Sequence, residues 1–333
     1  MHRTAGQHRL APTLCAVEEG NRQMSHTTDE HEHDEQDGAS CWLDDNRANW
    51  DDRVPVHVAS DFYDLTALRA GRGRLTPIEE SELSQLFPGG EDGTFDLSGL
   101  RVLHLQCHFG ADTLRLAQAG AEVVGIDFSR PAIKEARKLA AELGLADRAR
   151  FIVTDVYDLR HALPEPDSFD LVFTSWGTIT WLPNLTEWAS IIEWFLKPGA
   201  LFYFADGHPV AGVFDGLENG FPRFAYPYGS TEPFVIDDPS DYADQEARVE
   251  HGRTWEWSHT VSALWKAVTG ATLRLDHYEE HYEIPWKAFP SLQAQGDGMY
   301  RWPDDTRWLP LAHSLTAVKP MVGQTRPGSG REN

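Results

Sequence analysis

The sequence predicts an α/β protein with an open, doubly wound and mostly parallel sheet of seven strands, antiparallel at one edge. From residue 99 onward, short apolar runs alternate with amphipathic stretches, which is typical of β-α-β units and a parallel sheet. Two strand-like segments near the end of the chain, at 272–283 and 307–318, would pair as an antiparallel hairpin at the sheet edge. Such sheets bind ligands at the carboxyl ends of their strands, so we look for the site in the loops that follow them.

The first 98 residues precede the sheet and divide into two parts. Residues 1–40 are polar, lack periodicity and end in an acidic run, so we expect a disordered acidic tail. Within that run, His31 and His33 are expected to be solvated, and Met24 is a candidate for the natural start. Aromatic residues return near Trp42 and Trp50, and residues 41–98 are predicted to form a helical cover of one or two short helices.

The predicted core, residues 99–206, supplies five strands and three helices. Ser129 and Pro131 indicate where the second helix begins, because serine caps free amide groups and proline fits the first helical turn. Gly144 ends that helix, and the pair Pro198-Gly199 ends the third. The expected strands are 101–107, 121–126, 149–154, 170–174 and 200–205, and the expected helices are 111–119, 131–143 and 188–196.

The alternation of strands and helices stops at residue 207. Residues 207–259 lack a helical period and are rich in proline, glycine, aspartate and aromatic residues, which predicts an inserted lid or subdomain. Its aromatic side chains either cover the strand ends and enclose a flat or apolar ligand, or pack as a second small core. Its acids, including Asp241, either favour a cationic ligand or keep the insert soluble. Residues 260–320 add a helix at 262–268 and the edge strands, and 321–333 are expected to form a loose tail.

The composition excludes several classes of protein. The chain has 333 residues, with 52 Asp and Glu against 29 Lys and Arg, and a formal charge of −23. Affinity for nucleic acid comes mainly from clustered basic residues, so a general nucleic-acid binder is excluded. No apolar run reaches the roughly 18–20 residues of a membrane span and no targeting segment is visible, so we expect a soluble, cytoplasmic protein without a membrane partner. The isolated cysteines Cys15, Cys41 and Cys107 indicate reduced thiols and no zinc site.

Five motifs follow one another in the predicted core. The segment 102–114, Val-Leu-His-Leu-Gln-Cys-His-Phe-Gly-Ala-Asp-Thr-Leu, resembles motif I of the class I methyltransferases that use S-adenosylmethionine (SAM). The segments 124–129 and 151–156 are similar to the second and third strand ends of that family, whose acids hold the cofactor ribose and meet the adenine amine. The segments 169–176 and 196–201 are similar to the fourth strand and the turn into the fifth. The wider pattern is similar to a group of bacterial small-molecule methyltransferases.

The resemblance implies a Rossmann-like fold, SAM as cofactor, and cofactor-binding residues at the strand ends. Asp127 is expected to hold the ribose diol, because a carboxylate can accept two charge-assisted hydrogen bonds; its alternative is an acid that favours a helix macrodipole. Asp155 is expected to contact the adenine amine. Alternatively, it is an aspartate that stabilises a turn. Aromatic faces suit a sulfonium cation. Trp50 is expected to be one of the aromatic residues that face the sulfonium. The expected cofactor-binding residues are Tyr63, Gln106, Cys107, His108, Gly110, Asp127, Phe128, Asp155, Val156, Ser175 and Trp176.

Motif I departs from the common family pattern. Only Gly110 of the usual glycines remains, so the side chains of Gln106 and His108 must point away from the cofactor or take part in binding it. His104 stands near the usual acid and is expected either to be packed, to anchor a loop, or to face the acceptor. Cys107 is most simply a small buried hydrophobe. The missing glycines also disfavour a nicotinamide enzyme, whose pyrophosphate needs a Gly-x-Gly-x-x-Gly turn.

Methyl transfer is an in-line displacement, so the enzyme mainly aligns its substrates and excludes water. A hydroxyl acceptor also requires a base. His208, after the fifth strand, is the first candidate and His259 the second, because histidine titrates near neutral pH. Alternatively, either histidine caps a helix or packs in the core. An amine or thiolate acceptor would need no base. No metal is expected.

These observations predict a SAM-dependent methyltransferase acting on a small molecule. The alternative of the same fold is a protein that binds SAM or a product without methylating, such as a cyclase or a binding module. A nicotinamide oxidoreductase is a third possible function. The acceptor, the methylated atom and the oligomeric state are not determined by the sequence.

Overall fold

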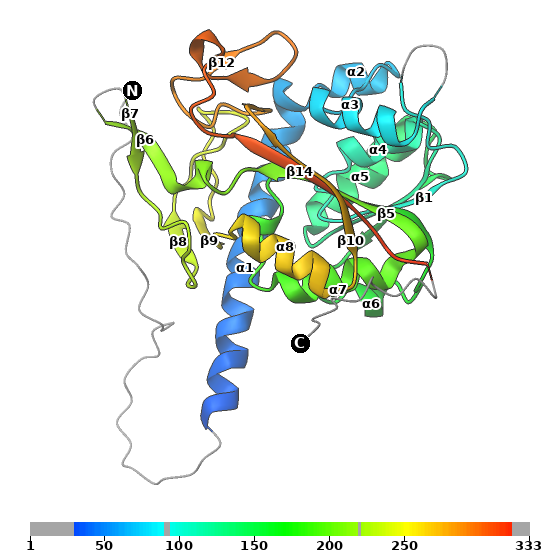
Figure 1. Cartoon of the computed structure of the whole chain (residues 1–333), viewed down its shortest axis with the longest axis horizontal. Helices are drawn as coiled ribbons and strands as arrows, with labels where there is room; N and C mark the ends of the chain where they lie inside the picture. Colours follow the sequence, from blue (N-terminus) through cyan, green and yellow to red (C-terminus); the bar gives the residue numbers. More distant parts are fainter. Residues whose placement is uncertain (1–29, 90–93, 219–220, 322–333) are drawn as a thin grey trace, which may run out of the picture.

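The computed structural model describes residues 30–89, 94–218 and 221–321 (Figure 1). The sheet confirms the predicted fold class: its first five strands run parallel, and the final strand runs antiparallel to both of its neighbours. The predicted tail segments 1–29 and 322–333, with Cys15 and Met24, lie outside the described ranges. In spatial order the strands are β10 (Arg274–His281), β14 (Ala312–Val318), β5 (Leu196–Gly207), β4 (Phe169–Ser175), β1 (Arg101–His104), β2 (Glu122–Asp127) and β3 (Ala149–Val153).

Helices cover both faces of this sheet and make three layers (Figure 1). On one face pack α4 (Ala111–Gln118) and α5 (Arg130–Glu142), and on the other α6 (Leu159–Ala162), α7 (Leu185–Phe195) and α8 (Val261–Gly270). The predicted cap is confirmed, because the Ser129 side chain accepts the N–H of Ala132 at 3.2 Å. Helix α7 begins earlier than the predicted residue 188, since Asn184 caps it by accepting the N–H of Glu187.

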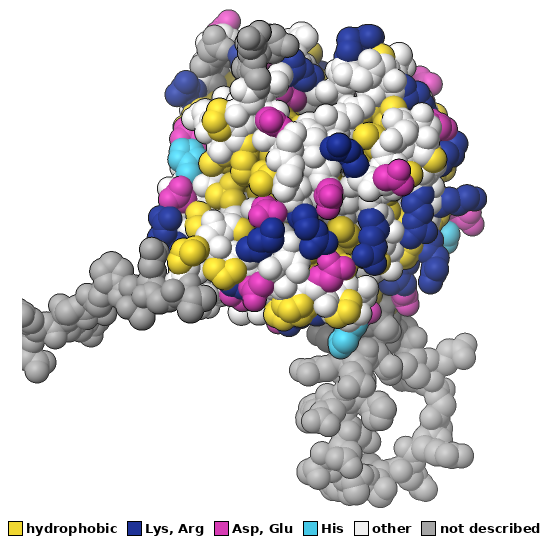
Figure 2. Space-filling view, turned by 90° about the vertical axis from the view of Figure 1, so that its right-hand side faces the viewer, with side chains coloured by type: hydrophobic (Ala, Val, Ile, Leu, Met, Phe, Trp, Pro, Cys, Tyr) yellow, Lys and Arg dark blue, Asp and Glu magenta, His cyan; other side chains and the backbone are white. Residues whose placement is uncertain are grey.

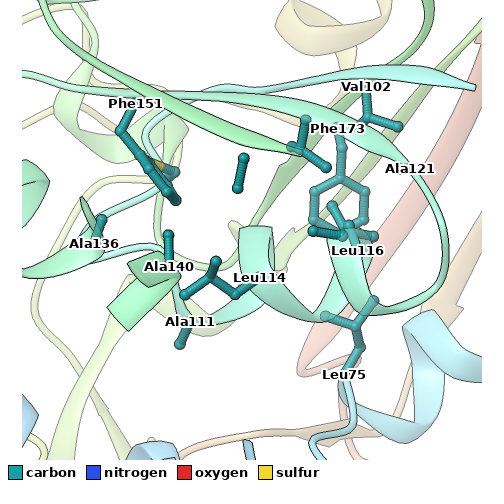
Figure 3. Close-up of a cluster of buried hydrophobic side chains, with 14 of the residues drawn as sticks. Leu75, Val102, Ala111, Leu114, Leu116, Ala121, Ala136, Ala140, Phe151 and Phe173 are labelled. Carbon is teal, nitrogen blue, oxygen red and sulfur yellow. The ribbon is translucent and has the colours of Figure 1, made fainter. Parts of the chain in front are cut away.

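The core on the first face combines large strand residues with small helix residues (Figure 3). Phe151 of β3 and Phe173 of β4 are buried, as are Ala136 and Ala140 of α5. Small residues on α5 let the helix lie close to the sheet. Ala111 and Leu114, the motif I residues at the start of α4, are buried in the same cluster, which anchors the motif.

The N-terminal cover consists of one long helix and three short ones. Helix α1 begins well before the predicted start of the cover, so residues 30–40 are helical where we expected an irregular tail. The bounds are α1 (Glu30–Ala59), η1 (Asp61–Tyr63), α2 (Leu65–Arg69) and α3 (Pro77–Leu86), the last with a capping box formed by Thr76 and Glu79.

The insert after β5 contains strands in place of the irregular segment that the sequence suggested. A short helix, η3 (Ala211–Val213), leads into two antiparallel pairs, β6 (Phe214–Glu218) with β7 (Phe221–Phe224) and β8 (Phe234–Asp237) with β9 (Arg253–Glu256). Helix α1 lies along β9: Asn46 Nδ2 donates to the Trp255 carbonyl at 2.9 Å, and Asn46 Oδ1 accepts the Trp255 N–H at 2.8 Å. The N-terminal cover and the insert are therefore joined.

The C-terminal part completes the sheet and adds a small second one. The predicted strands 272–283 and 307–318 correspond to β10 and β14, each shorter than expected. Between them lie three short antiparallel strands and a turn of 3-10 helix: β11 (Glu283–Ile284), β12 (Gln293–Ala294), β13 (Tyr300–Arg301) and η4 (Pro303–Asp305). The sequence analysis did not predict this small sheet, because strands of two residues have no periodicity to detect.

The face of the molecule in Figure 2 carries basic and acidic side chains side by side. Ion pairs such as Lys138 with Glu135, at 2.8 Å, connect neighbours on α5. Of the helices that the structure describes, none combines the length and the apolar character that crossing a bilayer requires.

Candidate functional site

The predicted site residues come together at one edge of the sheet. β1, β2, β3 and β4 are parallel neighbours and end at His104, Asp127, Val153 and Ser175. Because their carboxyl ends meet at the same edge, the loops that follow them face a common space. β5 ends beside β4 at Gly207, which adds the fifth loop to this edge.

The motif I loop keeps the backbone of a glycine-rich turn although most of its glycines are absent. Gln106, His108 and Gly110 have φ angles of 52°, 51° and 78°, all in the left-handed region. A Cβ atom at Gly110 would lie 2.7 Å from the Phe151 ring and 2.9 Å from the Ala136 Cβ, so packing requires glycine there. Gln106 and His108 therefore adopt a backbone conformation that glycine adopts most readily.

The side chains that replace the glycines make contacts of their own. Gln106 Nε2 donates to the Thr178 carbonyl at 2.9 Å and so joins the β1 loop to the β4 loop. The His108 ring packs edge-on against Trp50 of α1, with ring centroids 5.2 Å apart. Trp50 also contacts Trp181 at 5.4 Å. Trp50, one of the aromatic residues expected to face the sulfonium, thus lies beside the motif I loop together with Trp181, and its contact with the cofactor stays a prediction.

Asp127 is held in place by two backbone amides. The carboxylate accepts the N–H of His108 at 2.8 Å and the N–H of Ser129 at 2.9 Å. The side chain is 6% exposed, and its burial raises the pKa to about 6. The cap of α5 is Ser129 and not Asp127, so the macrodipole alternative accounts for the position less well. Each carboxylate oxygen retains a lone pair for a further donor.

The third strand end shows the turn geometry that we considered as an alternative for its acid. Asp155 Oδ1 accepts the N–H groups of Tyr157 at 2.9 Å and Asp158 at 3.1 Å. Val156 is buried in the hydrophobic core, and Phe128 is partly exposed at the end of β2. The turn leaves Oδ2 of Asp155 available, so a contact with adenine stays a prediction.

Two residues of motif I are packed behind the loop. Cys107 is buried, and a Cβ atom at Gly125 would lie 2.9 Å from its sulfur. His104 is buried too: its Nδ1 lies 2.8 Å from Thr113 Oγ1, and burial lowers its pKa to about 4. Of the roles considered for His104, the packed one matches this geometry.

The loop after β4 is organised by an acid that the sequence analysis missed. Asp206, near the end of β5, is buried and accepts the N–H groups of Gly177 at 2.6 Å and Thr178 at 2.9 Å. This loop carries Trp176, whose φ is 58° and whose ring lies 6.1 Å from that of Trp286. The signal that could have identified it is an acid in Ala-Asp-Gly at the end of a predicted strand, directly before His208.

A cavity of about 340 Å³ adjoins this loop. Three parts of the chain form its wall: the ends of β4 and β5, the insert, and the segments around β11 and β14. The wall is largely apolar and aromatic. Its side chains include Ile179, Asp206, His208, Phe214, Tyr226, Phe234, Ile236, Glu256, Trp257, His259, Ile284, Trp286, Phe289 and Leu311.

Both candidate bases line this cavity, and their hydrogen bonds distinguish them. His208 Nδ1 accepts the N–H of Val210 at 3.2 Å, and its Nε2 faces Glu280 Oε1 at 3.4 Å, so the neutral ring carries its proton on Nε2. His259 Nε2 lies 2.7 Å from the Leu182 carbonyl, which also places the proton on Nε2. Nδ1 of His259 is then the free lone pair. Burial lowers the pKa of both histidines, so each is neutral near pH 7.

The structure places Tyr63 beside motif I, and it gives Asp241 partners that the sequence analysis did not consider. The Tyr63 ring packs on Phe109 at 4.8 Å, and its hydroxyl contacts that of Tyr242 in the insert. Asp241 does not line the cavity described above; it pairs with Arg53 and His57 of α1. The pairing partners of this acid are far away in the sequence, so composition alone could not identify its role.

Unpartnered polar atoms near this edge fit SAM. Gln106 Oε1, Ser175 Oγ and Asp51 Oδ1 are buried and have no hydrogen-bond partner in the part of the chain that the structure describes. Asp51 of α1 also raises the pKa of Asp127 through its charge. SAM has hydroxyl and amino donors for such acceptors, and its sulfonium suits the aromatic side chains beside the motif I loop. No cluster of three or more His, Cys, Asp or Glu arranged for a metal occurs within residues 30–89, 94–218 and 221–321.

Comparison with known proteins identifies the family. A family model described as "Methyltransferase domain" matches residues 96–223. An uncharacterized methyltransferase of Synechocystis is 33% identical over 155 residues, which cover 41% of this chain and 68% of that protein. A protein of Oryza sativa subsp. japonica assigned as a chloroplast tocopherol O-methyltransferase is 26% identical over 78% of this chain and 69% of its own length.

Other matches cover less of the relatives or show the fold alone. A ubiquinone biosynthesis O-methyltransferase of Colwellia psychrerythraea is 27% identical over 44% of this chain and 59% of its own length. A solved Listeria monocytogenes structure, assigned as a SAM-dependent methyltransferase, has a TM-score of 0.50 and 17% identity over 72% of this chain and 97% of its own. With the strand ends and motif I loop described above, these matches show that the chain belongs to the class I SAM-dependent methyltransferases.

Proposed function

We propose that this protein transfers the methyl group of SAM to a small, largely apolar acceptor that carries a hydroxyl group. The observation that carries the proposal is the position of the cavity. Its wall includes Gly177 and Asp206, at the loop that also carries Trp176, so the cavity adjoins the edge where the motif I loop and Asp127 lie. A ligand at this edge and a ligand in the cavity would be neighbours.

The cofactor is assigned to the loops after β1, β2, β3 and β4. Asp127 would accept the ribose hydroxyls, Asp155 the adenine amine, and Phe128 and Val156 would lie against the adenine ring. Gln106, His108, Ser175 and Trp176 would border the methionine portion, with Gly110 giving the backbone its turn. SAM, when bound, supplies an electrophilic methyl group. The residues of the chain hold and orient it and exclude water from it.

The cavity favours a flat and apolar acceptor. Most of its wall consists of aromatic and aliphatic side chains, with Phe214, Tyr226 and Trp257 from the insert and Trp286 from the C-terminal part. Such a wall binds apolar surface without specific polar contacts, and a few polar groups then fix orientation. Glu256 and His259 are such groups. Relatives named as O-methyltransferases support oxygen as the methylated atom.

We assign the base to His259 in preference to His208. A general base needs a free lone pair, and the hydrogen bond from His259 to the Leu182 carbonyl leaves Nδ1 in that state. In His208 the Nδ1 lone pair is already occupied by the N–H of Val210. Nε2 of His208 faces Glu280 at 3.4 Å without a hydrogen-bond partner among the described residues, and the residue forms part of the wall of the cavity.

The first experiment is calorimetric titration of the full chain with SAM and S-adenosylhomocysteine, with NAD and NADP as controls. Binding of the two sulfur compounds, and of neither nicotinamide, is expected. The second step measures S-adenosylhomocysteine release with a panel of flat phenols, catechols and hydroxyquinones. SAM binding without any release across this panel would contradict the proposed transfer to a hydroxyl group, and the absence of release with amines and thiols as well would favour a binding or cyclising role.

A further inference from the structure

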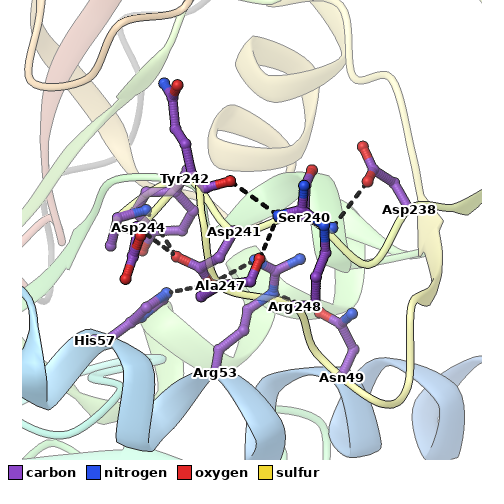
Figure 4. Close-up of polar contacts among 12 residues, drawn as sticks. Asn49, Arg53, His57, Asp238, Ser240, Asp241, Tyr242, Asp244, Ala247 and Arg248 are labelled. Carbon is purple, nitrogen blue, oxygen red and sulfur yellow. Dashed lines mark hydrogen bonds and ion pairs between the residues drawn. The ribbon is translucent and has the colours of Figure 1, made fainter. Parts of the chain in front are cut away.

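A buried polar network joins the insert to the motif I loop through helix α1. Figure 4 shows its first part, the contacts of Asp241 in the insert with Arg53 and His57 of α1. Asp241 of the insert accepts hydrogen bonds from two residues one turn apart on α1: Arg53 at 2.8 Å and His57 at 3.0 Å. Its second oxygen accepts the backbone N–H of Ala243 at 2.7 Å and of Asp244 at 3.2 Å. The carboxylate is thus fully occupied, and these contacts hold its pKa at about 2.

The network continues from His57 to motif I. His57 is buried, and its Nδ1 lies 2.8 Å from Nε2 of His108. An ionised Asp241 is only an acceptor, and burial lowers the pKa of His57, so the neutral His57 ring carries its proton on Nε2 and accepts at Nδ1, which also lies 3.3 Å from the Tyr63 hydroxyl. His108 must therefore donate from its own Nε2. A single charged group in the insert thereby sets the tautomers of two successive rings.

The position of His108 in turn affects Asp127, the acid at the end of β2. Its backbone N–H donates to Asp127 at 2.8 Å, and its φ of 51° is one that a non-glycine residue rarely adopts. A residue in this conformation keeps it only where its surroundings hold it. The bond to His57, together with the contact to Trp50 at 5.2 Å, holds the ring of His108.

We propose that His57 and Asp241 are positioning residues for the cofactor site, which fix His108 and, through its N–H group, Asp127. The inference rests on the proposed role of Asp127 in binding the cofactor. It goes further in making cofactor affinity depend on contact between α1 and the insert. The insert also lines the acceptor cavity, so the segment that covers the acceptor contributes to holding the cofactor acid.

Stability alone does not explain the network. Buried charged and polar groups are often no more stabilising than apolar residues of the same size, because they lose their hydration. What this network provides is orientation, since each ring has one donor and one acceptor at fixed positions. The aromatic neighbours Trp50, Tyr63 and Tyr242 could hold an apolar side chain at position 57 equally well, but not the tautomer of His108.

The first test compares Asp241→Asn and His57→Gln with the natural chain by calorimetric titration with S-adenosylhomocysteine. Asparagine keeps the shape of Asp241 but permits the wrong tautomer of His57. Glutamine replaces the ring by an amide whose nitrogen and oxygen can exchange places, so the order of donor and acceptor between Asp241 and His108 is no longer fixed. Both variants are expected to weaken binding about tenfold, the loss of roughly one hydrogen bond. The matched control is His161→Gln, which alters an exposed His-Asp pair (2.9 Å to Asp158) and should leave affinity unchanged.

Unchanged affinity in both variants would overturn the positioning role. Asp127→Ala separates this failure from failure of the cofactor assignment: if it leaves affinity unchanged, the assignment of Asp127 is wrong, and if it alone weakens binding, only the role of His57 and Asp241 is wrong. If a variant does not fold, the positioning role is tested by a measurement on the natural chain. Nitrogen-15 shifts of the histidine rings should show protons on Nε2 of both His57 and His108, and a proton on Nδ1 of His57 would contradict the inference.

Discussion

Single residues in the motif I loop show how a position can keep its conformation without its usual residue. Gln106 and His108 adopt the left-handed backbone that glycine normally provides, while Gly110 remains glycine because Phe151 and Ala136 leave no room for a Cβ atom. The first two positions are held by tertiary contacts of their side chains, and the third by steric exclusion. The two kinds of constraint predict different responses to substitution.

Gly110→Ala should destabilise the protein by about 2–4 kcal/mol, because it adds overpacking against a ring to a strained φ. Gly144→Ala is the control: Gly144 has a φ of 67° but no atom within 4 Å of the added Cβ, so only the backbone cost of about 1 kcal/mol is expected. Urea denaturation of both variants measures the difference. Equal losses would mean that the space around Gly110 can adjust.

Asp127→Ala should weaken SAM binding by about 1–3 kcal/mol, because it removes a charged acceptor that is already aligned by two amides. Calorimetry at pH 7.5 measures the change. A dissociation constant equal to that of the natural protein would remove Asp127 from the cofactor site.

The two cavity histidines should differ in their contribution to catalysis. His259→Ala is expected to lower turnover about a hundredfold or more with SAM affinity retained, since a positioned base contributes roughly that factor. His208→Ala is expected to lower turnover less, because its Nδ1 is engaged with Val210. Single-turnover rates with an identified acceptor measure both. The reverse order of effects would assign the base to His208.

At the scale of elements, α1 and the insert behave as one cover. Along α1, Asp45, Asn46, Asn49, Asp52, Arg53 and His57 each bond to a residue of the insert between Asp241 and Trp255. The insert has few strands of its own and no large separate core in the described residues. Its order therefore depends on the helix.

Asn46→Ala should weaken the contact between α1 and the insert, because it leaves both the N–H and the carbonyl of Trp255 without their side-chain partner. We expect a loss of about 1–3 kcal/mol and faster hydrogen exchange confined to β8 and β9. Asp44→Ala, on the exposed side of α1 where Asp44 pairs only with Arg47, is the control. Hydrogen exchange that is unchanged at β9 would show that the insert is stable without this contact to α1.

At the scale of the whole molecule, the cofactor should stabilise the fold in a pH-dependent way. S-adenosylhomocysteine at a hundred times its dissociation constant should add about 2.7 kcal/mol, or roughly 4 °C in melting temperature. The pKa of Asp127 is raised to about 6 in the free protein, so below that pH a proton must leave before the carboxylate can accept the ribose. Binding should therefore weaken as pH falls through 6.

At pH 5 the same ligand concentration should give only about 1.4 kcal/mol, which corresponds to affinity reduced about tenfold. Thermal melts with and without ligand at pH 7.5 and pH 5 measure both values. A shift of equal size at the two pH values would mean that ligand binding does not require the ionised carboxylate.

The sequence alone predicted the strands along the chain, the antiparallel pair near its end, the positions of most core helices and the acids at the strand ends. These features depend on local periodicity and on motifs within a few residues, such as the cap at Ser129. It failed where local signals are weak, as in the short strands of the insert, and at residues 30–40, where acidic composition suggested a tail and α1 continues.

Only the tertiary structure decided which distant side chains meet. His57 lies 51 positions from His108 and 184 from Asp241, and their contact depends on how α1 is rotated against the motif I loop and the insert. The choice between His208 and His259 likewise depends on which carbonyl or amide each ring nitrogen reaches. Periodicity determines which face of an element is apolar, but hydrogen-bond partners are set by the packing of elements against one another.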